Sequence, residues 1–546
     1  MSGSLRLFHF VIFGIWLVLL SCGGASWAQQ ARSTAVIDPP PMGWSSWNSF
    51  SNTVDSHVVM EEARALISTG LHAAGYKYVN IDEGWWLGQR DAEGNIVVDP
   101  EAWPALAPGE HAGDMSNIVR FIHGLGLKAG IYTDAGANGC SMYPDLGPKY
   151  FHTGSEGHYD QDFLQFAKWG FDYVKVDWCG GDKENLDPAV QYAEIAQAIQ
   201  RAEAITGHRM FFSICEWGKN SPWTWAPNVG GISADIWRTS GDIVAPVVAN
   251  AKHAGRKAQF SKAIGNFEQG QHPEAQHTGY ENDLDMMVIG MPGLDERQDR
   301  AHMAMWSVSG APLILGADLT KLNQETLAIL MNRAVLAIDQ DPLGLPAVKV
   351  AQPGKGLEAW SKRLAEPGAR AMLLLNRTES AEPITVKWDD LGLASSSGVG
   401  VEVTDVWTGK KLPASSNSYS ATVQPQDAAL VLVHGRNRAM TAYSSGDAEQ
   451  GVPVTNAVPV RFNHVTSQYR MAAIRIRYRN AADAPAYAEL HVNHQVVTRI
   501  GFPPTGGGVR AVWVQAMLST TKPNTVSFSA TTWSARAPKI VSLAVQ

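Results

Sequence analysis

From about Pro39 to Leu345 the sequence repeats one pattern, in which a short apolar run is followed by a stretch with helical periodicity. The expected strands lie within 42–48, 76–86, 127–134, 173–179, 209–218, 235–242, 282–287 and 311–318, and the expected helices at 54–68, 118–125, 163–169, 189–204 and 298–308. Alternating strands and helices predict a parallel sheet. Eight units in about 300 residues predict an α/β fold of the closed (β/α)8, or TIM, barrel type.

Polar and aromatic side chains gather at the C-terminal ends of these expected strands. They are Trp47, Asp82, Glu83, Asp134, Asp177, Glu216, Arg238, Asp242, Asp283 and Asp285. Barrel enzymes build their active sites at this end, so we expect a functional site there. Asp177, at the end of an apolar strand, has two interpretations on residue type alone: the cap of the next helix or a catalytic group.

Two all-β regions follow the expected barrel. Residues 346–436 contain short strands with turn signals at Thr408-Gly409 and Gln426-Asp427, which predicts a small antiparallel β-sandwich. Residues 437–546 alternate with period two around 474–479, 486–492 and 525–529, which predicts a further all-β domain. We therefore expect a barrel over 36–345, a sandwich over 346–436 and a C-terminal β domain over 437–546.

The N-terminus has the pattern of an export signal. Arg6 precedes an apolar run from Phe8 to Leu20, and Ser26-Trp27-Ala28 offers small residues for cleavage. We expect a signal peptide over 1–28 and an exported protein, periplasmic or secreted. The alternative is lipidation of Cys22 in a lipoprotein-like Leu19–Cys22 segment, which would attach the protein to a membrane. The net charge of −8 argues against binding to nucleic acid.

Several carboxylates at one end of a barrel suggest cleavage of glycosidic bonds. That reaction needs one ionised carboxylate to attack the anomeric carbon, or to activate water, and a second that donates a proton to the leaving oxygen. Sequence spacing does not rank the candidate acids.

Six motifs do rank them. They are Pro41–Asn48, Gly130–Gly136, Val174–Asp177, Ile214–Gly218, Trp237–Ile243 and Asp283–Met286. In this order they resemble glycoside hydrolase family 27, the family of α-galactosidases and α-N-acetylgalactosaminidases. The resemblance covers roughly residues 36–345 and continues through the sandwich. It implies a retaining exo-glycosidase that removes terminal α-D-galactosyl residues, with neither metal nor cofactor.

By this resemblance Asp177 is the nucleophile and Asp242 the general acid/base. Lys175, two residues before Asp177 on one strand, points to the same side, and its ammonium favours the ionised carboxylate. The resemblance implies sugar contacts for Trp47, Asp82, Glu83, Tyr132, Lys175, Glu216, Arg238 and Asp285. Glu216 after Cys215 is the α-galactosidase pattern and argues against an N-acetylated sugar.

The cysteines are assigned by the same resemblance, which pairs Cys140 with Cys179. Such a disulfide would fix the chain two residues beyond the nucleophile. Some relatives bond the position of Cys215, but the partner position here is Ala234. We expect Cys215 to be a buried free thiol.

Glu83 departs from the family pattern, in which two aspartates follow the second strand. Its extra methylene extends the carboxylate further and could crowd the C6 hydroxymethyl group of galactose, unless Glu83 simply rotates away. β-L-Arabinopyranose lacks that group, so a β-L-arabinopyranosidase is the alternative activity. The expected partner is a carbohydrate substrate, a galactoside or an arabinopyranoside, with a plant polysaccharide as one candidate.

The last domain loosely resembles family 35 carbohydrate-binding modules, through segments 478–480, 490–493 and 502–506. It is expected either to bind glycan or to act as a spacer. An alternative of another class, for the chain as a whole, is a non-catalytic glycan-binding protein built on an inactive barrel.

Overall fold

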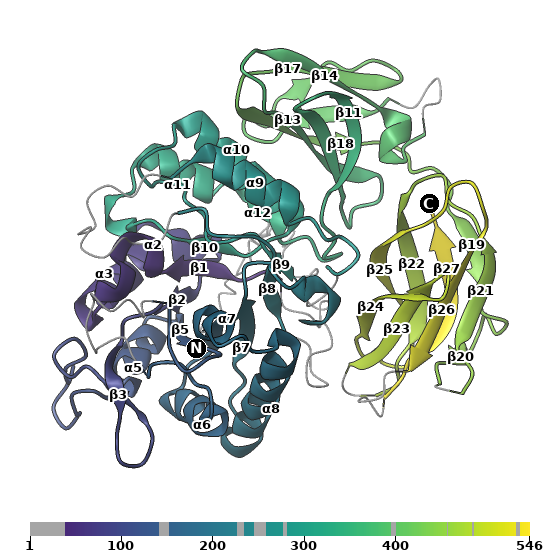
Figure 1. Ribbon diagram of the computed structural model, residues 1–546. Coiled ribbons are helices and arrows are strands. Elements are labelled where there is room, and N and C mark those ends of the chain that lie inside the picture. The colour runs from purple at the N-terminus through teal and green to yellow at the C-terminus, as the bar shows by residue number, and fades with distance from the viewer. Residues whose placement is uncertain are drawn as a thin grey trace, which may run out of the picture. The chain divides into compact units, whose positions relative to one another are not determined.

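The computed structural model describes residues 39–140, 152–226, 234–244, 258–276, 281–394, 400–455, 457–482, 485–530 and 536–546 (Figure 1). The expected signal peptide and Cys22 lie outside these residues, and export stays a prediction. Within the described residues, no helix combines the length and apolar character that crossing a membrane requires.

The first part of the chain forms the expected barrel. Its parallel strands are hydrogen-bonded in the order β10-β1-β2-β5-β6-β7-β8-β9. Their bounds are β1 (Met42–Ser45), β2 (Tyr78–Asn80), β5 (Lys128–Asp134), β6 (Tyr173–Asp177), β7 (Phe211–Cys215), β8 (Ile236–Arg238), β9 (Glu281–Asp283) and β10 (Leu313–Leu315). A parallel bridge between Met287 and Leu315 joins the segment after β9 to β10 and closes the ring.

The barrel helices follow the strands as predicted, with additions. They are α2 (Trp47–Phe50), α3 (Ser56–Ser68), α4 (Leu71–Ala74), α5 (Ser116–Gly124), α6 (Tyr159–Trp169), α7 (Cys179–Lys183), α8 (Pro188–Thr206), α9 (Phe260–Gln269), α10 (Glu296–Ser309), α11 (Gln324–Leu330) and α12 (Arg333–Asp339). A hairpin of β3 (Trp86–Arg90) and β4 (Ile96–Val98) interrupts the alternation after β2.

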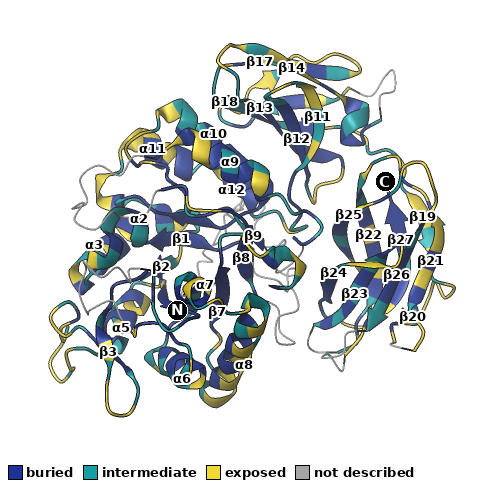
Figure 2. Cartoon of the chain, viewed as in Figure 1, coloured by how far each residue is buried: buried dark blue, intermediate teal, exposed yellow. Residues whose placement is uncertain are grey.

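Local sequence explains where the long helices begin and end. Asp55 caps α3 by accepting a hydrogen bond from the N–H of Val58, and Asp187 caps α8 with Pro188 at its first position. Asp295 forms a capping box at the start of α10. The barrel strands are buried, while the helices carry exposed residues on their outer faces (Figure 2).

The inside of the barrel is packed at the end where the strands begin. Tyr173 stacks on Phe211 with ring centroids 5.3 Å apart, and Tyr78 contacts both rings. These aromatic side chains fill the barrel below the polar end, which leaves the opposite end of the strands for the site.

The sandwich is antiparallel, as expected. One sheet has the order β11-β12-β13-β18-β15-β16, and β14 pairs with β17. The bounds are β11 (Val348–Gly354), β12 (Leu357–Arg363), β13 (Ala369–Asn376), β14 (Glu382–Lys387), β15 (Glu402–Asp405), β16 (Lys411–Leu412), β17 (Ser418–Val423) and β18 (Asp427–His434).

The C-terminal region is all-β and has a core of its own. One sheet contains β19 (Thr441–Ser444), β20 (Val452–Pro453), β22 (Met471–Arg479), β25 (Arg510–Met517) and β27 (Lys539–Val545), and the other β21 (Val460–Val465), β23 (Ala486–Val492), β24 (Gln495–Phe502) and β26 (Asn524–Ala530). Ile474, Leu490 and Phe528 are among the fully buried residues between these sheets.

Candidate active site

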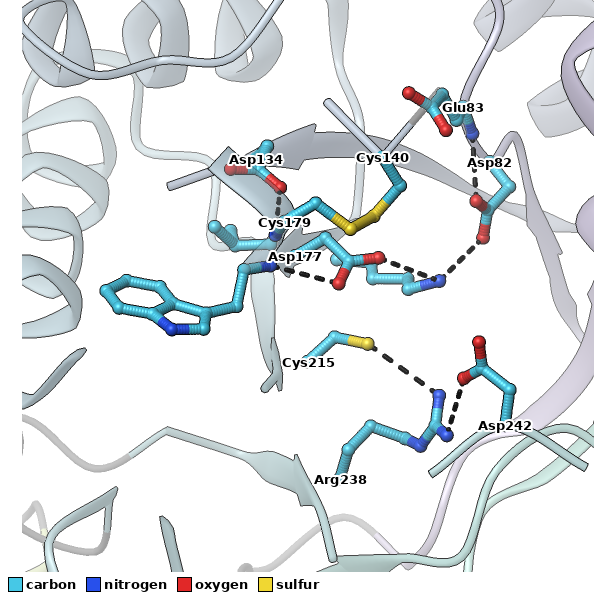
Figure 3. A network of polar contacts seen from close by, with 12 residues as sticks. Asp82, Glu83, Asp134, Cys140, Asp177, Cys179, Cys215, Arg238 and Asp242 are labelled. Atoms are coloured by element: carbon cyan, nitrogen blue, oxygen red, sulfur yellow. Dashed lines mark hydrogen bonds and ion pairs between the residues drawn. A yellow bond between two sulfur atoms is a disulfide. The ribbon is translucent and has the colours of Figure 1, made fainter. Parts of the chain in front are cut away.

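The residues predicted for the site all lie at the C-terminal end of the barrel strands. Trp47 follows β1, Asp82 and Glu83 follow β2, Tyr132 lies on β5, Lys175 and Asp177 lie on β6, Glu216 follows β7, Arg238 ends β8, Asp242 lies beyond it, and Asp285 follows β9. Six of them form two charged groups, Lys175 with Asp82 and Asp177, and Arg238 with Asp242 and Asp285. Cys215 of β7 lies between Asp177 and Arg238 (Figure 3).

The first group is centred on the ammonium of Lys175. Its Nζ lies 3.0 Å from Oδ2 of Asp82 and 3.7 Å from Oδ2 of Asp177. Burial lowers the pKa of Lys175, but the charges of Asp82 and Asp177 outweigh burial and hold that pKa well above its usual value. Lys175 is therefore a fixed positive charge between two carboxylates.

Asp177 is almost fully buried at the end of β6. Its Oδ1 accepts a hydrogen bond from the N–H of Trp178 at 3.0 Å, which orients the carboxylate. Burial raises the pKa of Asp177 to about 6, against the opposing effect of Lys175 and with a further upward contribution from Asp242. The carboxylate is therefore ionised at neutral pH but poorly solvated, which suits a nucleophile.

The second group is centred on the guanidinium of Arg238. Nη2 lies 3.0 Å from Oδ1 of Asp242, and Nη1 lies 3.0 Å from Oδ1 of Asp285. Asp285 is buried, whereas 39% of the Asp242 side chain is exposed. Arg238 thus anchors a carboxylate that stays accessible to a ligand.

Among the buried polar atoms at this end that have no protein partner in the described residues are the hydroxyl of Tyr132 and Oε1 of Glu216. The other oxygen of Glu216 accepts hydrogen bonds from the N–H and Nδ2 of Asn220, and burial raises the pKa of Glu216 to about 7. Because buried polar atoms are nearly always hydrogen-bonded, these two atoms fit contacts with ligand hydroxyls.

The disulfide between Cys140 and Cys179 is present, and Cys215 is a buried free cysteine, so both predictions are confirmed. Asp134, opposite Asp177 in the pairing of β5 with β6, holds the same region. It accepts hydrogen bonds from the N–H groups of Gly136, Gly180 and Cys179. Cys140, Cys179, Asp134 and Asp177 are close enough together to suggest a metal site. Instead, the two cysteines are joined in the disulfide, and Asp134 accepts hydrogen bonds from three N–H groups. These three residues therefore fix the chain beside the nucleophile.

Sequence reasoning missed the supports of the charged groups. Ser46 Oγ accepts a hydrogen bond from the N–H of Asp82, and the N–H of Ile243 donates to Oδ2 of Asp285. Among the residues that support the site, Asp134 is the one that the sequence could indicate, because it is an acidic residue at the end of the strand next to that of Asp177.

Glu83 is fully buried, and its carboxylate takes one of the two directions that the sequence left open. In Figure 3 the carboxylate of Asp82 points into the cluster, whereas that of Glu83 points toward its edge. Glu83 lies against Gly139 instead. This orientation is the alternative in which Glu83 rotates away.

A barrel with buried and accessible carboxylates at the C-terminal end of its strands holds the groups that cleavage of a glycosidic bond requires. Family models match residues 39–341 (alpha galactosidase A), 354–433 (alpha galactosidase C-terminal beta sandwich domain) and 460–540 (alpha-galactosidase, CBM13 domain). The chain belongs to the alpha galactosidase A family, glycoside hydrolase family 27. The C-terminal match confirms the coarser expectation of a carbohydrate-binding-module-like domain, but under a family number other than 35.

Individual proteins agree with the family models. Alpha-galactosidase A of Cellvibrio japonicus is 40% identical over 361 residues, which cover 66% of this chain and 81% of that protein. The crystal structure of alpha-galactosidase I from Mortierella vinacea is 30% identical, covers 73% of this chain and 98% of its own, and has a TM-score of 0.62. A β-L-arabinopyranosidase of Geobacillus stearothermophilus has a TM-score of 0.60, covers 73% of this chain and 96% of its own, and at 20% identity shares the fold alone.

Proposed function

We propose that this chain hydrolyses terminal, non-reducing α-D-galactosyl residues with retention of anomeric configuration. The observation that carries the proposal is the pair of carboxylates on separate strands: buried Asp177 beside Lys175, and accessible Asp242 on Arg238. The charge of Asp242 contributes to the raised pKa of Asp177, so the two carboxylates are close enough to interact electrostatically. The choice of galactose as the sugar rests on the family match and on the α-galactosidase relatives.

The proposed mechanism is a double displacement. Asp177 attacks the anomeric carbon and forms a glycosyl ester, while Asp242 donates a proton to the departing oxygen. Asp242 then takes a proton from a water molecule, which attacks the same carbon and releases the sugar together with the Asp177 carboxylate. Two inversions at one carbon give net retention.

The remaining predicted residues have proposed roles as sugar ligands. Asp82 and Lys175 present a charged acceptor and a charged donor side by side, which suits two neighbouring hydroxyls. Tyr132 and Glu216 each offer a buried polar atom that a hydroxyl would satisfy. The half-buried indole of Trp47 offers an apolar surface for a sugar face.

The test compares Asp177→Ala, Asp242→Ala and wild type on nitrophenyl α-galactoside and on an alkyl α-galactoside. Asp177→Ala should lose activity on both. Asp242→Ala should lose about 10²–10⁴-fold on the alkyl substrate and less on the nitrophenyl one, because nitrophenolate departs without a proton. Asp160→Ala, on the exposed side of α6, is the matched control. If wild type and both variants are equally inactive, the proposal fails.

A further inference from the structure

The loop that carries Asp242 follows β8, and hydrogen bonds hold both of its ends to the segment after β9. At its start, the N–H of Thr239 donates to the carbonyl of Asp283 at 3.0 Å. At its end, the N–H of Ile243 donates to Oδ2 of Asp285 at 2.8 Å. Asp242 lies between these two points, so its position also depends on how the middle of the loop is held.

The middle of this loop is held from α9 by the side chain of Asn266, which is buried. Its Nδ2 donates to the carbonyl of Gly241 at 2.7 Å and to the carbonyl of Leu284 at 3.0 Å. Gly241 directly precedes Asp242, and Leu284 directly precedes Asp285. Because a primary amide has two N–H groups, this one side chain joins the two segments that present these carboxylates.

The end of α9 also lies close against both segments. Gly270 ends the helix one turn after Asn266, so the two residues share a face of α9. A methyl group on the Cα of Gly270 would overlap Cδ2 of Leu284 and would lie 2.6 Å from Oγ1 of Thr239. The lack of a side chain at position 270 is therefore what lets α9 approach closely enough for Asn266 to reach both carbonyls.

The two residues after Asn266 hold α9 to the β-sandwich. The ring of Phe267 packs edge-on against Trp360 of β12, with ring centroids 4.9 Å apart. Oε2 of Glu268 lies 2.8 Å from Nη1 of Arg377, which follows β13. Since α9 is fixed in this way, the amide of Asn266 gives the loop after β8 a fixed point of attachment.

We propose that Asn266 is a positioning residue for Asp242, and that it holds the loop so that this carboxyl can protonate the leaving oxygen. Asp177 is oriented separately, by the N–H of Trp178. Loss of the Asn266 amide should therefore impair proton transfer more than nucleophilic attack. This inference rests on the proposed function, because it takes Asp242 as the general acid.

The experiment measures kcat/KM for methyl α-D-galactoside and nitrophenyl α-D-galactoside. Nitrophenolate departs without a proton, whereas methanol must gain one as it departs. Both substrates carry the same sugar, so weaker sugar binding lowers the two values alike and leaves their ratio unchanged. Asn266→Ala should lower the methyl-to-nitrophenyl ratio by about 10-fold or more, because a small misplacement of a catalytic group is costly.

The Asp242→Ala background tests whether Asn266 acts through Asp242. With that carboxyl absent, Asn266→Ala should change the ratio by less than about 2-fold. Asn266→Asp keeps the shape of the side chain but, once ionised, has no N–H to donate, so it should lower the ratio as Asn266→Ala does. Gln269→Ala is the matched control, because it removes an exposed amide from the same helix, and it should leave the ratio unchanged.

An unchanged ratio in an Asn266 variant that folds, or an equal fall in the Asp242→Ala background, overturns the inference while the galactosidase proposal stands. If Asn266→Ala does not fold, Asn266→Asp decides. If neither variant folds, Asn266 is a structural residue and the inference fails. A wild type inactive on both substrates, or an Asp242→Ala variant with the wild-type ratio, refutes the proposed function instead.

Discussion

At the scale of single residues, the site combines charges that burial makes costly with partners that keep them ionised. The carboxylate of Asp177 has its pKa raised to about 6 chiefly by burial, and Lys175 limits the rise. A nucleophile needs the ionised form, so the acidic limb of the kcat/KM profile on nitrophenyl α-galactoside should lie near pH 6, with activity rising as pH increases.

Replacing Lys175 by Met tests the cause of that limb. Without the ammonium 3.7 Å away, the pKa of Asp177 should rise further, and the limb should move to higher pH in addition to any loss of sugar affinity. The measurement is the pH profile of kcat/KM for the variant and wild type. A limb that stays in place would assign the titration to another group.

Burial of the ionised Asp177 carboxylate should also lower the free energy of unfolding. Because the pKa of Asp177 is raised on folding, its stabilising contribution is fully present below pH 3.8, its unfolded value, and is lost as pH rises to about 6. At pH 7 the free energy of unfolding of Asp177→Asn should therefore exceed that of wild type by about 1–3 kcal/mol. Lys175 keeps Asp82 as a partner in that variant.

The gain should shrink toward pH 4, where the wild-type carboxyl is protonated in the folded protein. Denaturant unfolding of both proteins at the two pH values measures this. Equal stability of the two proteins at pH 7 would show that Lys175 fully offsets the cost of burial.

At the scale of secondary-structure elements, the disulfide ties the segment after β5 to the start of α7. The cysteines are 39 residues apart, a separation for which the chain-entropy model gives about 4 kcal/mol. The double variant Cys140→Ser, Cys179→Ser should lose about that much in urea unfolding. Its kcat/KM should also fall, because Cys179 lies two residues beyond Asp177.

Cys215→Ala serves as the control for the loss of a buried cysteine that has no bridge. A double variant as stable as wild type would show that the three N–H groups on Asp134 hold this region without the disulfide.

Most strands of the barrel could be predicted from the sequence because a polar side chain follows an apolar run; β9, which contains no apolar residue, is an exception. Other elements lacked such a signal. α9 contains Gly265, which weakens a helical pattern, and β3 begins at Trp86 within what reads as one strand from 76 to 86. The Glu83 carboxylate lies against Gly139, which is 56 residues further along the chain, so only the folded chain shows this contact.

At the scale of the whole molecule, the buried cores predict which parts fold alone. The core of residues 437–546, with Ile474, Leu490 and Phe528, is separate from the other hydrophobic clusters among the described residues. A fragment of these residues should unfold cooperatively by itself. The chain ending at residue 436 should keep its kcat/KM on nitrophenyl α-galactoside within about 2-fold, since every proposed site residue lies before that point.

Calorimetry of the fragment and kinetics of the shortened chain are the measurements. A fragment without a cooperative transition would show that this core needs the rest of the chain.

The strands of the barrel form a ring that is closed by a single β-bridge. Between the segment after β9 and β10, the closure is the bridge of Met287 with Leu315, supported by hydrogen bonds from the N–H of Met287 to Ile314 and from the N–H of Gly316 to Met287. β5 and β6, by contrast, share five paired positions. Thermal breathing should therefore open the ring at this seam first, and the amide protons of Met287 and Gly316 should exchange with solvent sooner than those of β6. Asp285 stands at the seam and Asp177 on the opposite, protected side, so such openings would disturb the anchoring of Asp285 and Arg238 before they reach the nucleophile.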